Sequence, residues 1–178
     1  MVVLILLSQL PFVYRRYKLG RLNAAILLLN SQRQLEANDE AFAEYKGVIH
    51  VHSSLGGHST GSFDQIIAGA NRNQLNFVVL TEHTSKNFNT AQMTLKGVHG
   101  GVLFINGNEV NTAASEHLLR IPGDETTVGA SDPSAQEIIS QGKATGSLMF
   151  VAYPAEFRSW DATGYDGLEV YNVYTDAR

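Results

Sequence analysis

The sequence predicts an α/β domain built on a parallel sheet, either open or barrel-like. The runs Phe77-Val-Val-Leu80 and Val102-Leu-Phe-Ile105 are continuously apolar, which is typical of strands buried on both faces. Segments with the length and polarity of helices lie between such runs, and this alternation favours a parallel sheet. The 178 residues, 44% of them hydrophobic and 16 of them glycine, suit one globular domain with many tight turns.

The expected elements begin after residue 45. A first strand at 47–52 leads into a glycine-rich loop and a helix at 62–74, where Asp64 suits the positive end of the helix dipole. A polar stretch at 88–96 suits a helix, and a loop rich in turn residues spans 122–133. The other expected elements are strands at 76–81, 101–106, 117–121, 147–152 and 167–173 and a helix at 132–143.

Residues 1–35 form a separate apolar and basic segment, which a linker at 36–45 joins to the domain at 46–178. Met1 to Val13 is almost wholly apolar and is followed by Arg15, Arg16, Lys18 and Arg21. Neither this run nor Ala24–Leu29 reaches the roughly 20 residues of a membrane-spanning helix. Residues 1–29 therefore suit either the remnant of a membrane anchor, with the domain on the cytoplasmic side, or a helix that packs on the domain or a partner of a cytoplasmic protein. The basic flank favours the membrane interpretation.

Composition excludes several kinds of site. The chain has no cysteine, so disulfides and thiolate zinc sites are excluded and any metal must be held by imidazole and carboxylate groups. The net charge of -4 argues against general nucleic-acid binding, which needs a surplus of Lys and Arg.

Five of the six histidines lie where an apolar run gives way to polar residues, and a glutamate lies near a fourth such place. These residues are His50, His52, His58, His83, His117 and Glu109. Singly they have ordinary explanations, such as a solvated loop position for His58 or a buried, hydrogen-bonded ring for His117. Their joint occurrence at strand ends is typical of a multi-metal site, because α/β proteins place their sites at that edge.

The spacing of the histidines supports this interpretation. His50 and His52 are two apart on a strand, so both side chains point to one face and can reach one cation. His58 follows Gly56-Gly57, a hinge that lets the backbone fold back. His83 lies on a loop after an apolar strand, and we interpret the neighbouring Glu82 as solvated rather than as a partner of a ligand histidine. His99 lies in a turn and carries no such expectation.

These ordered motifs resemble those of the PHP (polymerase and histidinol phosphatase) superfamily. The motifs are His50-Val-His52, His58, Thr81-Glu-His83, Gly107-Asn-Glu109 and His117-Leu-Leu. The resemblance implies a distorted (β/α)7 barrel with two or three divalent ions, zinc, manganese or iron, that hydrolyses phosphomonoesters or phosphodiesters. It places His50, His52 and Glu109 on a first metal, His117 with bridging Glu109 on a second, and His58 and His83 on a third. Glu109 and His83 are the residues expected to serve catalysis.

Two departures from the PHP pattern affect the expected activity. Tyr153 stands where the family has a histidine or cysteine before proline, and the late Asp-x-His pair is not found. We therefore expect a partial barrel from a C-terminally truncated chain, with a naturally shortened member as the alternative.

The predicted function is metal-dependent hydrolysis of a phosphorylated small molecule or nucleotide. The alternative is a catalytically impaired metal-binding or membrane-tethered interaction domain. Hydrolysis of C–N bonds is less favoured, because no strand carries a lysine suited to carbamylation. Arg158 is a candidate to contact a substrate phosphate, and Trp160 is expected to pack.

Overall fold

The computed structural model of the chain describes residues 9–18, 20, 21, 24, 28, 43–57, 59–124 and 133–172. Residue contacts divide the chain into two units, Met1–Glu44 and Tyr45–Arg178. In the first unit residues 9–18 are helical, with Leu10, Phe12 and Val13 exposed. Where the structure is described, no helix combines the length and the apolar character needed to cross a bilayer. The apolar and basic helical segment is therefore described only in part, and its membrane association stays a prediction.

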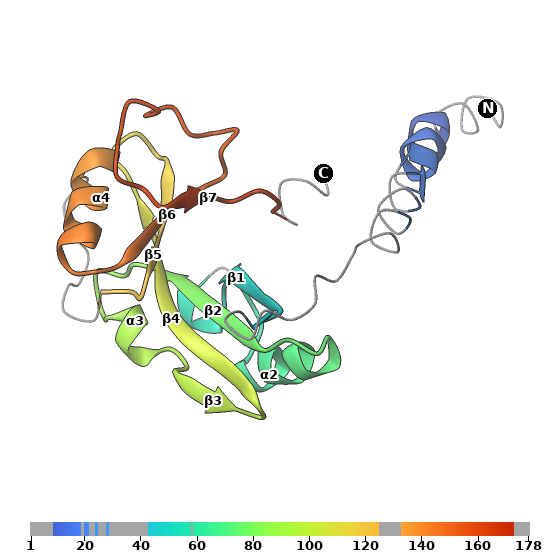
Figure 1. Cartoon of the computed structure of the whole chain (residues 1–178), viewed down its shortest axis with the longest axis horizontal. Helices are drawn as coiled ribbons and strands as arrows, with labels where there is room; N and C mark the ends of the chain where they lie inside the picture. Colours follow the sequence, from blue (N-terminus) through green and yellow to red (C-terminus); the bar gives the residue numbers. More distant parts are fainter. Residues whose placement is uncertain are drawn as a thin grey trace. The chain divides into compact units, whose positions relative to one another are not determined.

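The second unit is a mixed α/β fold whose sheet curls into a half-barrel (Figure 1). The strands are β1 (Gly47–Val51), β2 (Phe77–His83), β3 (Gly97–His99), β4 (Val102–Asn111), β5 (His117–Ile121), β6 (Leu148–Ala152) and β7 (Gly167–Leu168). Their order in the sheet is β1-β2-β4-β5-β6-β7, with β3 paired to β4. The helices are η1 (Ser54–Gly56), α2 (Phe63–Arg72), α3 (Thr90–Met93) and α4 (Ala135–Ala144). The prediction of an α/β fold with a partial barrel is confirmed at this level.

The prediction of a parallel sheet is wrong for two strands. β1, β2 and β4 pair in parallel, as do β6 and β7, but β5 runs antiparallel to both β4 and β6, and β3 runs antiparallel to β4. The short connection from Asn111 to His117 explains the direction of β5, because a parallel strand would need a crossover of a dozen or more residues. β3 was not predicted at all, and its last residue, His99, pairs with Val102 instead of lying in a turn.

Alternation along the strands separates the helix-packed core from the opposite face of the sheet. Val78, Leu80 and Phe104 pack with α2, whereas Leu118, Met149 and Val151 pack with α4. The intervening side chains point to the other face, since the side-chain period of a strand is two. Both helices begin with a capping box, Ser62 with Gln65 and Ser134 with Glu137, which satisfies backbone N–H groups at the first turn. The two helices thus cover one face, and the other face carries polar side chains together with buried apolar ones such as Val79 and Leu119.

Gly123, two residues after the end of β5, is closely packed against neighbouring residues, and a substitution there tests this packing. A Cβ atom at this position would lie 2.7 Å from the Cβ of Ala91 and 2.8 Å from the backbone carbon of Gly107. We expect Gly123→Ala to lower the free energy of unfolding by about 1–3 kcal/mol, the usual cost of overpacking. Urea denaturation checks this, with Gly69→Ala in α2 as the control. Apart from the nearby backbone of α2 itself, no atom lies within 4 Å of a Cβ built there, so the control should gain about 0.5–1 kcal/mol.

Candidate metal centre

The strand register brings the chemistry-bearing residues to one edge of the sheet. His83 on β2 is the direct partner of Glu109 on β4. His117, the first residue of β5, pairs with Asn111 on β4 and Ala152 on β6. Because β5 is antiparallel, its start lies at the same edge as the ends of β2, β4 and β6. The reversed strand therefore explains how a histidine that opens a strand joins residues that close strands.

His50 lies on an irregular part of β1. Val48 pairs with Val78 and Val51 pairs with Leu80, so β1 carries one extra residue at this point. His50 has φ 66°, in the left-handed region that few side-chain-bearing residues adopt. Bulges bend a strand and re-aim a side chain. The predicted regular strand is therefore wrong here, although His50 and His52 do point to the same place, with ring centroids 5.2 Å apart.

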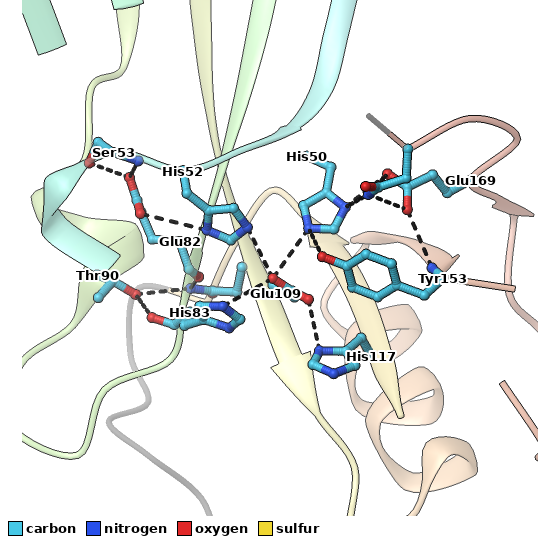
Figure 2. Close-up of polar contacts among 12 residues, drawn as sticks. His50, His52, Ser53, Glu82, His83, Thr90, Glu109, His117, Tyr153 and Glu169 are labelled. Atoms are coloured by element: carbon cyan, nitrogen blue, oxygen red, sulfur yellow. Dashed lines mark hydrogen bonds and ion pairs between the residues drawn. The ribbon is translucent and has the colours of Figure 1, made fainter. Parts of the chain in front are cut away.

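Glu109 lies at the centre of four imidazoles (Figure 2). Its Oε2 atom is 3.2 Å from His50 Nε2, 3.0 Å from His52 Nε2 and 3.3 Å from His83 Nε2. Its Oε1 atom is 2.8 Å from His117 Nδ1. The Glu109 side chain is only 1% exposed, whereas those of His83 and His117 are 27% and 23% exposed. We call these five residues the histidine cluster.

Charge in the histidine cluster is balanced between imidazoles and carboxylates. Burial alone would raise the pKa of Glu109, but the close imidazoles of His117, His50 and His52 outweigh it and hold the pKa far below its usual range. Burial alone would lower the pKa of His50, but Glu109 and Glu169 together raise it to about 9. In the absence of a cation, the His50 ring is therefore protonated on both nitrogens at neutral pH. Its positive charge offsets negative charge on the buried carboxylates.

The histidine cluster has the donor set and spacing of a cation site. His50, His52 and Glu109 each offer one ligand atom within 4.8 Å of the others. Ligand atoms about 2.1 Å from one cation lie about 3.0–3.4 Å apart, which matches the distances around Oε2. Within the described part of the chain, no donor makes a hydrogen bond of good geometry to either buried oxygen of Glu109. Imidazole with one carboxylate is compatible with zinc, manganese or iron.

Glu169 and Tyr153 complete the surroundings of His50. The sequence patterns did not indicate Glu169, whereas Tyr153 occupies the position at which the PHP pattern has a histidine or cysteine. Glu169, just after β7, lies 2.9 Å from His50 Nδ1. The hydroxyl group of Tyr153 lies 3.5 Å from His50 Nε2, and its ring makes edge contacts with His50 and His117. Burial, followed by Glu109 and Glu169, raises the pKa of Tyr153 to about 12, so it stays a neutral phenol. Glu169 could have been indicated by its place in the short run Gly167–Val170, which ends at the same edge of the sheet.

The interpretation of Glu82 as a solvated residue is wrong. Its side chain is fully buried, and its Oε1 atom accepts hydrogen bonds from the backbone N–H and the hydroxyl group of Ser53. Its Oε2 atom lies 3.9 Å from His52 Nδ1. Glu82 shares the helix-packed face with Leu80, and Ser53 follows His52 directly, so the carboxylate holds the loop that carries His52.

Of the two histidines that do not belong to the five residues of the histidine cluster, the structure describes only His99. His58 falls outside the described residues, so its predicted role stays a prediction. His99 lies on β3, where its Nε2 atom is 2.9 Å from the carbonyl oxygen of Lys96 and its ring contacts Phe104. His83 lies beside His52, with stacked rings 4.8 Å apart, and its Nε2 atom approaches the same oxygen of Glu109 as His52.

Glu116, next to His117, holds the loop that follows β6. The buried carboxylate accepts hydrogen bonds from the backbone N–H groups of Arg158 and Ser159, at 2.6 and 2.7 Å, and from the hydroxyl group of Ser159. The Arg158 side chain is exposed, and its role as a phosphate contact stays a prediction. Trp160 packs edge-on against Phe157, as expected.

The Glu116 contacts predict an acid-sensitive stabilisation. Burial raises the pKa of Glu116, but these hydrogen bonds outweigh it, so the pKa lies below its ordinary value of 4.5. The carboxylate therefore stabilises the fold above that value and loses this effect as the pH falls through the lowered pKa. We expect Glu116→Gln to cost about 1–3 kcal/mol at pH 7 and less at pH 3. Urea denaturation at both pH values checks this, and an equal cost at both would contradict it.

The comparisons with known proteins identify the fold. No protein-family model matches the chain, and a search of curated proteins finds no match. A two-domain protein from Bacteroides vulgatus that contains a predicted PHP-like metal-dependent phosphoesterase is similar in structure, with 20% identity and a TM-score of 0.49. A candidate metal-dependent phosphoesterase from Bifidobacterium adolescentis is similar at 13% identity with a TM-score of 0.50.

The extent of these matches differs between the two structures. The first match covers 81% of this chain but only 45% of the Bacteroides protein. The second covers 72% of this chain and 78% of the Bifidobacterium protein. At 13% identity the likeness to the Bifidobacterium protein establishes the fold alone and leaves the reaction to be argued from the site.

Proposed function

We propose that this chain, which has the fold of PHP-like metal-dependent phosphoesterases, hydrolyses phosphate esters with divalent cations held by the histidine cluster. The observation that carries the proposal is the buried Glu109 carboxylate, which four imidazole nitrogens approach within 2.8–3.3 Å. When bound, such cations lower the pKa of water, polarise phosphoryl oxygens and offset charge on the leaving group. A nucleophilic side chain is then unnecessary, in keeping with the lack of cysteine.

Differences in exposure indicate how a substrate would reach the cluster. The side chains of His50 and Glu109 are 3% and 1% exposed and lie at its base. His83 and His117, with roughly a quarter of their side chains exposed, lie on the open side. A phosphoryl group would therefore approach between His83 and His117. The neutral Tyr153 hydroxyl group, beside His50, is available to donate a hydrogen bond to a phosphoryl oxygen.

The organic part of the substrate has space beside the cluster. A cavity of about 430 Å³ lies between the loop after β6 and the segment after β7 and is lined by Tyr153, Pro154, Leu168, Glu169 and Tyr171 among others. This volume falls in the range of small-molecule pockets, which is about 300–1,000 Å³. It supports a phosphorylated small molecule or nucleotide as the substrate rather than a large polymer.

Hydrolysis assays with defined metals test the proposed function. Protein treated with EDTA and dialysed would receive Mn²⁺ or Zn²⁺ and then p-nitrophenyl phosphate or its bis-ester. We expect release of nitrophenol that depends on the added metal and saturates with substrate. His99→Ala, on β3 outside the cluster, should keep the activity of the unmodified chain. Failure to hydrolyse either ester by protein shown to contain bound metal would contradict the proposal.

A further inference from the structure

The contacts of Glu169 give it a defined place behind His50. Glu169 is buried, and its Oε1 atom lies 2.9 Å from His50 Nδ1 although 119 positions separate the two residues. Asn172 Nδ2 donates to both carboxylate oxygens at 3.0 Å. The backbone N–H of Tyr153 donates to Oε2 at 3.3 Å. Figure 2 shows the Glu169 carboxylate on the side of the imidazole away from Glu109.

The two nitrogens of His50 therefore face different partners. Nδ1 faces Glu169, and Nε2 faces Glu109 at 3.2 Å. A carboxylate can only accept, so Nδ1 carries a proton. When a cation takes the place of the proton on Nε2, the ring is neutral and presents the lone pair of Nε2 to that cation. An acceptor behind an imidazole in this way fixes both the tautomer and the orientation of a ligand ring.

The backbone at His50 departs from that of a regular strand. The residue lies in a bulge with φ 66°, where the regular alternation of side chains along β1 is interrupted. His52 has a different arrangement, since the nearest oxygen of Glu82 is 3.9 Å from its Nδ1 atom, beyond hydrogen-bonding distance. At His50, by contrast, a carboxylate oxygen of Glu169 lies 2.9 Å from Nδ1, within hydrogen-bonding distance.

We propose that Glu169 is a positioning residue that holds His50 with Nδ1 protonated and Nε2 directed into the histidine cluster, and so raises the affinity of the cluster for a divalent cation. This inference rests on the proposed metal binding and goes beyond it, because it assigns a role to a residue that contributes no ligand atom. It also links the end of β7 to the first strand through one side chain.

Zinc affinity provides the first test. The metal-free chain and its variants would be titrated with Zn²⁺ in competition with a chromophoric chelator at one pH above 9, so that competition from the second proton of His50 does not alter the comparison. Glu169→Ala is expected to bind Zn²⁺ about 10–100-fold more weakly, as is usual when the acceptor behind a ligand histidine is lost. Glu169→Gln, which keeps an oxygen acceptor, should lose less. Gly123→Ala, which is expected to be destabilised through its contacts with Ala91 and Gly107, controls for a general loss of stability and should bind like the unmodified chain.

Nitrogen NMR of the imidazole rings provides the second test. In the zinc-loaded chain, long-range ¹H–¹⁵N spectra should show His50 with a protonated Nδ1 and a metal-bound Nε2, the signal being assigned by its loss in His50→Gln. Glu169→Ala should lose this single tautomer. Unchanged zinc affinity in Glu169→Ala, a loss no larger than in Gly123→Ala, or a His50 bound through Nδ1 would each overturn the inference. If Glu169→Ala does not fold, Glu169→Gln and the tautomer of the unmodified chain still decide it.

The two proposals fail in distinguishable ways. Zinc binding that depends on Glu169, without hydrolysis of any ester, would remove the proposed function and leave the role of Glu169 intact. Metal-dependent hydrolysis with unchanged zinc affinity in Glu169→Ala would do the reverse.

Discussion

Glu109→Gln is expected to reduce metal-dependent hydrolysis of p-nitrophenyl phosphate by about a thousandfold. The amide keeps the shape of the side chain but loses the charge that draws four imidazole nitrogens within 2.8–3.3 Å. One oxygen of Glu109 faces three of the imidazoles and the other faces His117. A neutral amide would therefore weaken cation binding at both oxygen positions. Cations supply several kcal/mol of transition-state stabilisation, and each 1.36 kcal/mol is about tenfold in rate. The measurement is kcat/KM with saturating Mn²⁺.

Glu137→Gln is a matched control for the Glu109 experiment. Glu137 is an exposed carboxylate in the capping box of α4, away from the cluster, so its exchange should leave hydrolysis unchanged. Circular dichroism and elemental analysis of both variants would separate loss of folding or of metal from loss of chemistry. Activity of Glu109→Gln close to that of the unmodified chain would assign the hydrolysis to a contaminant or to another site.

Cation affinity is expected to rise with pH by about a hundredfold between pH 7 and 9. In the metal-free chain the carboxylates of Glu109 and Glu169 raise the pKa of His50 to about 9, so the ring is protonated at both nitrogens at neutral pH. A ligand imidazole must be deprotonated, so cation and proton compete for Nε2. Below the pKa the apparent affinity should therefore increase about tenfold per pH unit, and it should level off above pH 9.

Calorimetry measures this competition directly. Titration of Zn²⁺ in buffers with different ionisation enthalpies at pH 7.5 should reveal release of about one proton per cation from the cluster. The proton lost is that of Nε2, because Nδ1 faces Glu169 at 2.9 Å. His50→Ala, which lacks the titrating ring, is the control and should release less. Affinity that stays constant from pH 7 to 9, with no proton released, would contradict the assignment of His50 as a protonated group in the metal-free chain.

Most elements of the domain could be predicted from local patterns. The strands around Val78, Phe104 and Val151 follow from continuous apolar runs, which are typical of buried strands, although Leu103 in β4 is exposed. α2 follows from its spacing and its Ser62 cap. β3 was missed, since its three residues, which begin with Gly97, carry too little pattern. The direction of β5 was missed because local periodicity does not report strand orientation.

The candidate site could be predicted in part. Imidazoles at strand ends indicated His50, His52, His83 and His117, and the structure brings all four to Glu109. Glu169 and Glu82 could not be assigned in this way, because a buried carboxylate that supports a ligand and a solvated one look alike in a single sequence. The bulge at His50 was also out of reach, since it arises from the pairing of β1 with β2.

The amino-acid sequence alone determined the kind of chemistry: oxygen and nitrogen ligands without sulfur, carried on the ends of buried strands. Tertiary structure alone decided which residues meet, because contacts such as His50 with Glu169 span 119 positions and depend on strand order and direction. Residue types are local properties, whereas burial, protonation and distance are set by neighbours that lie far away along the chain.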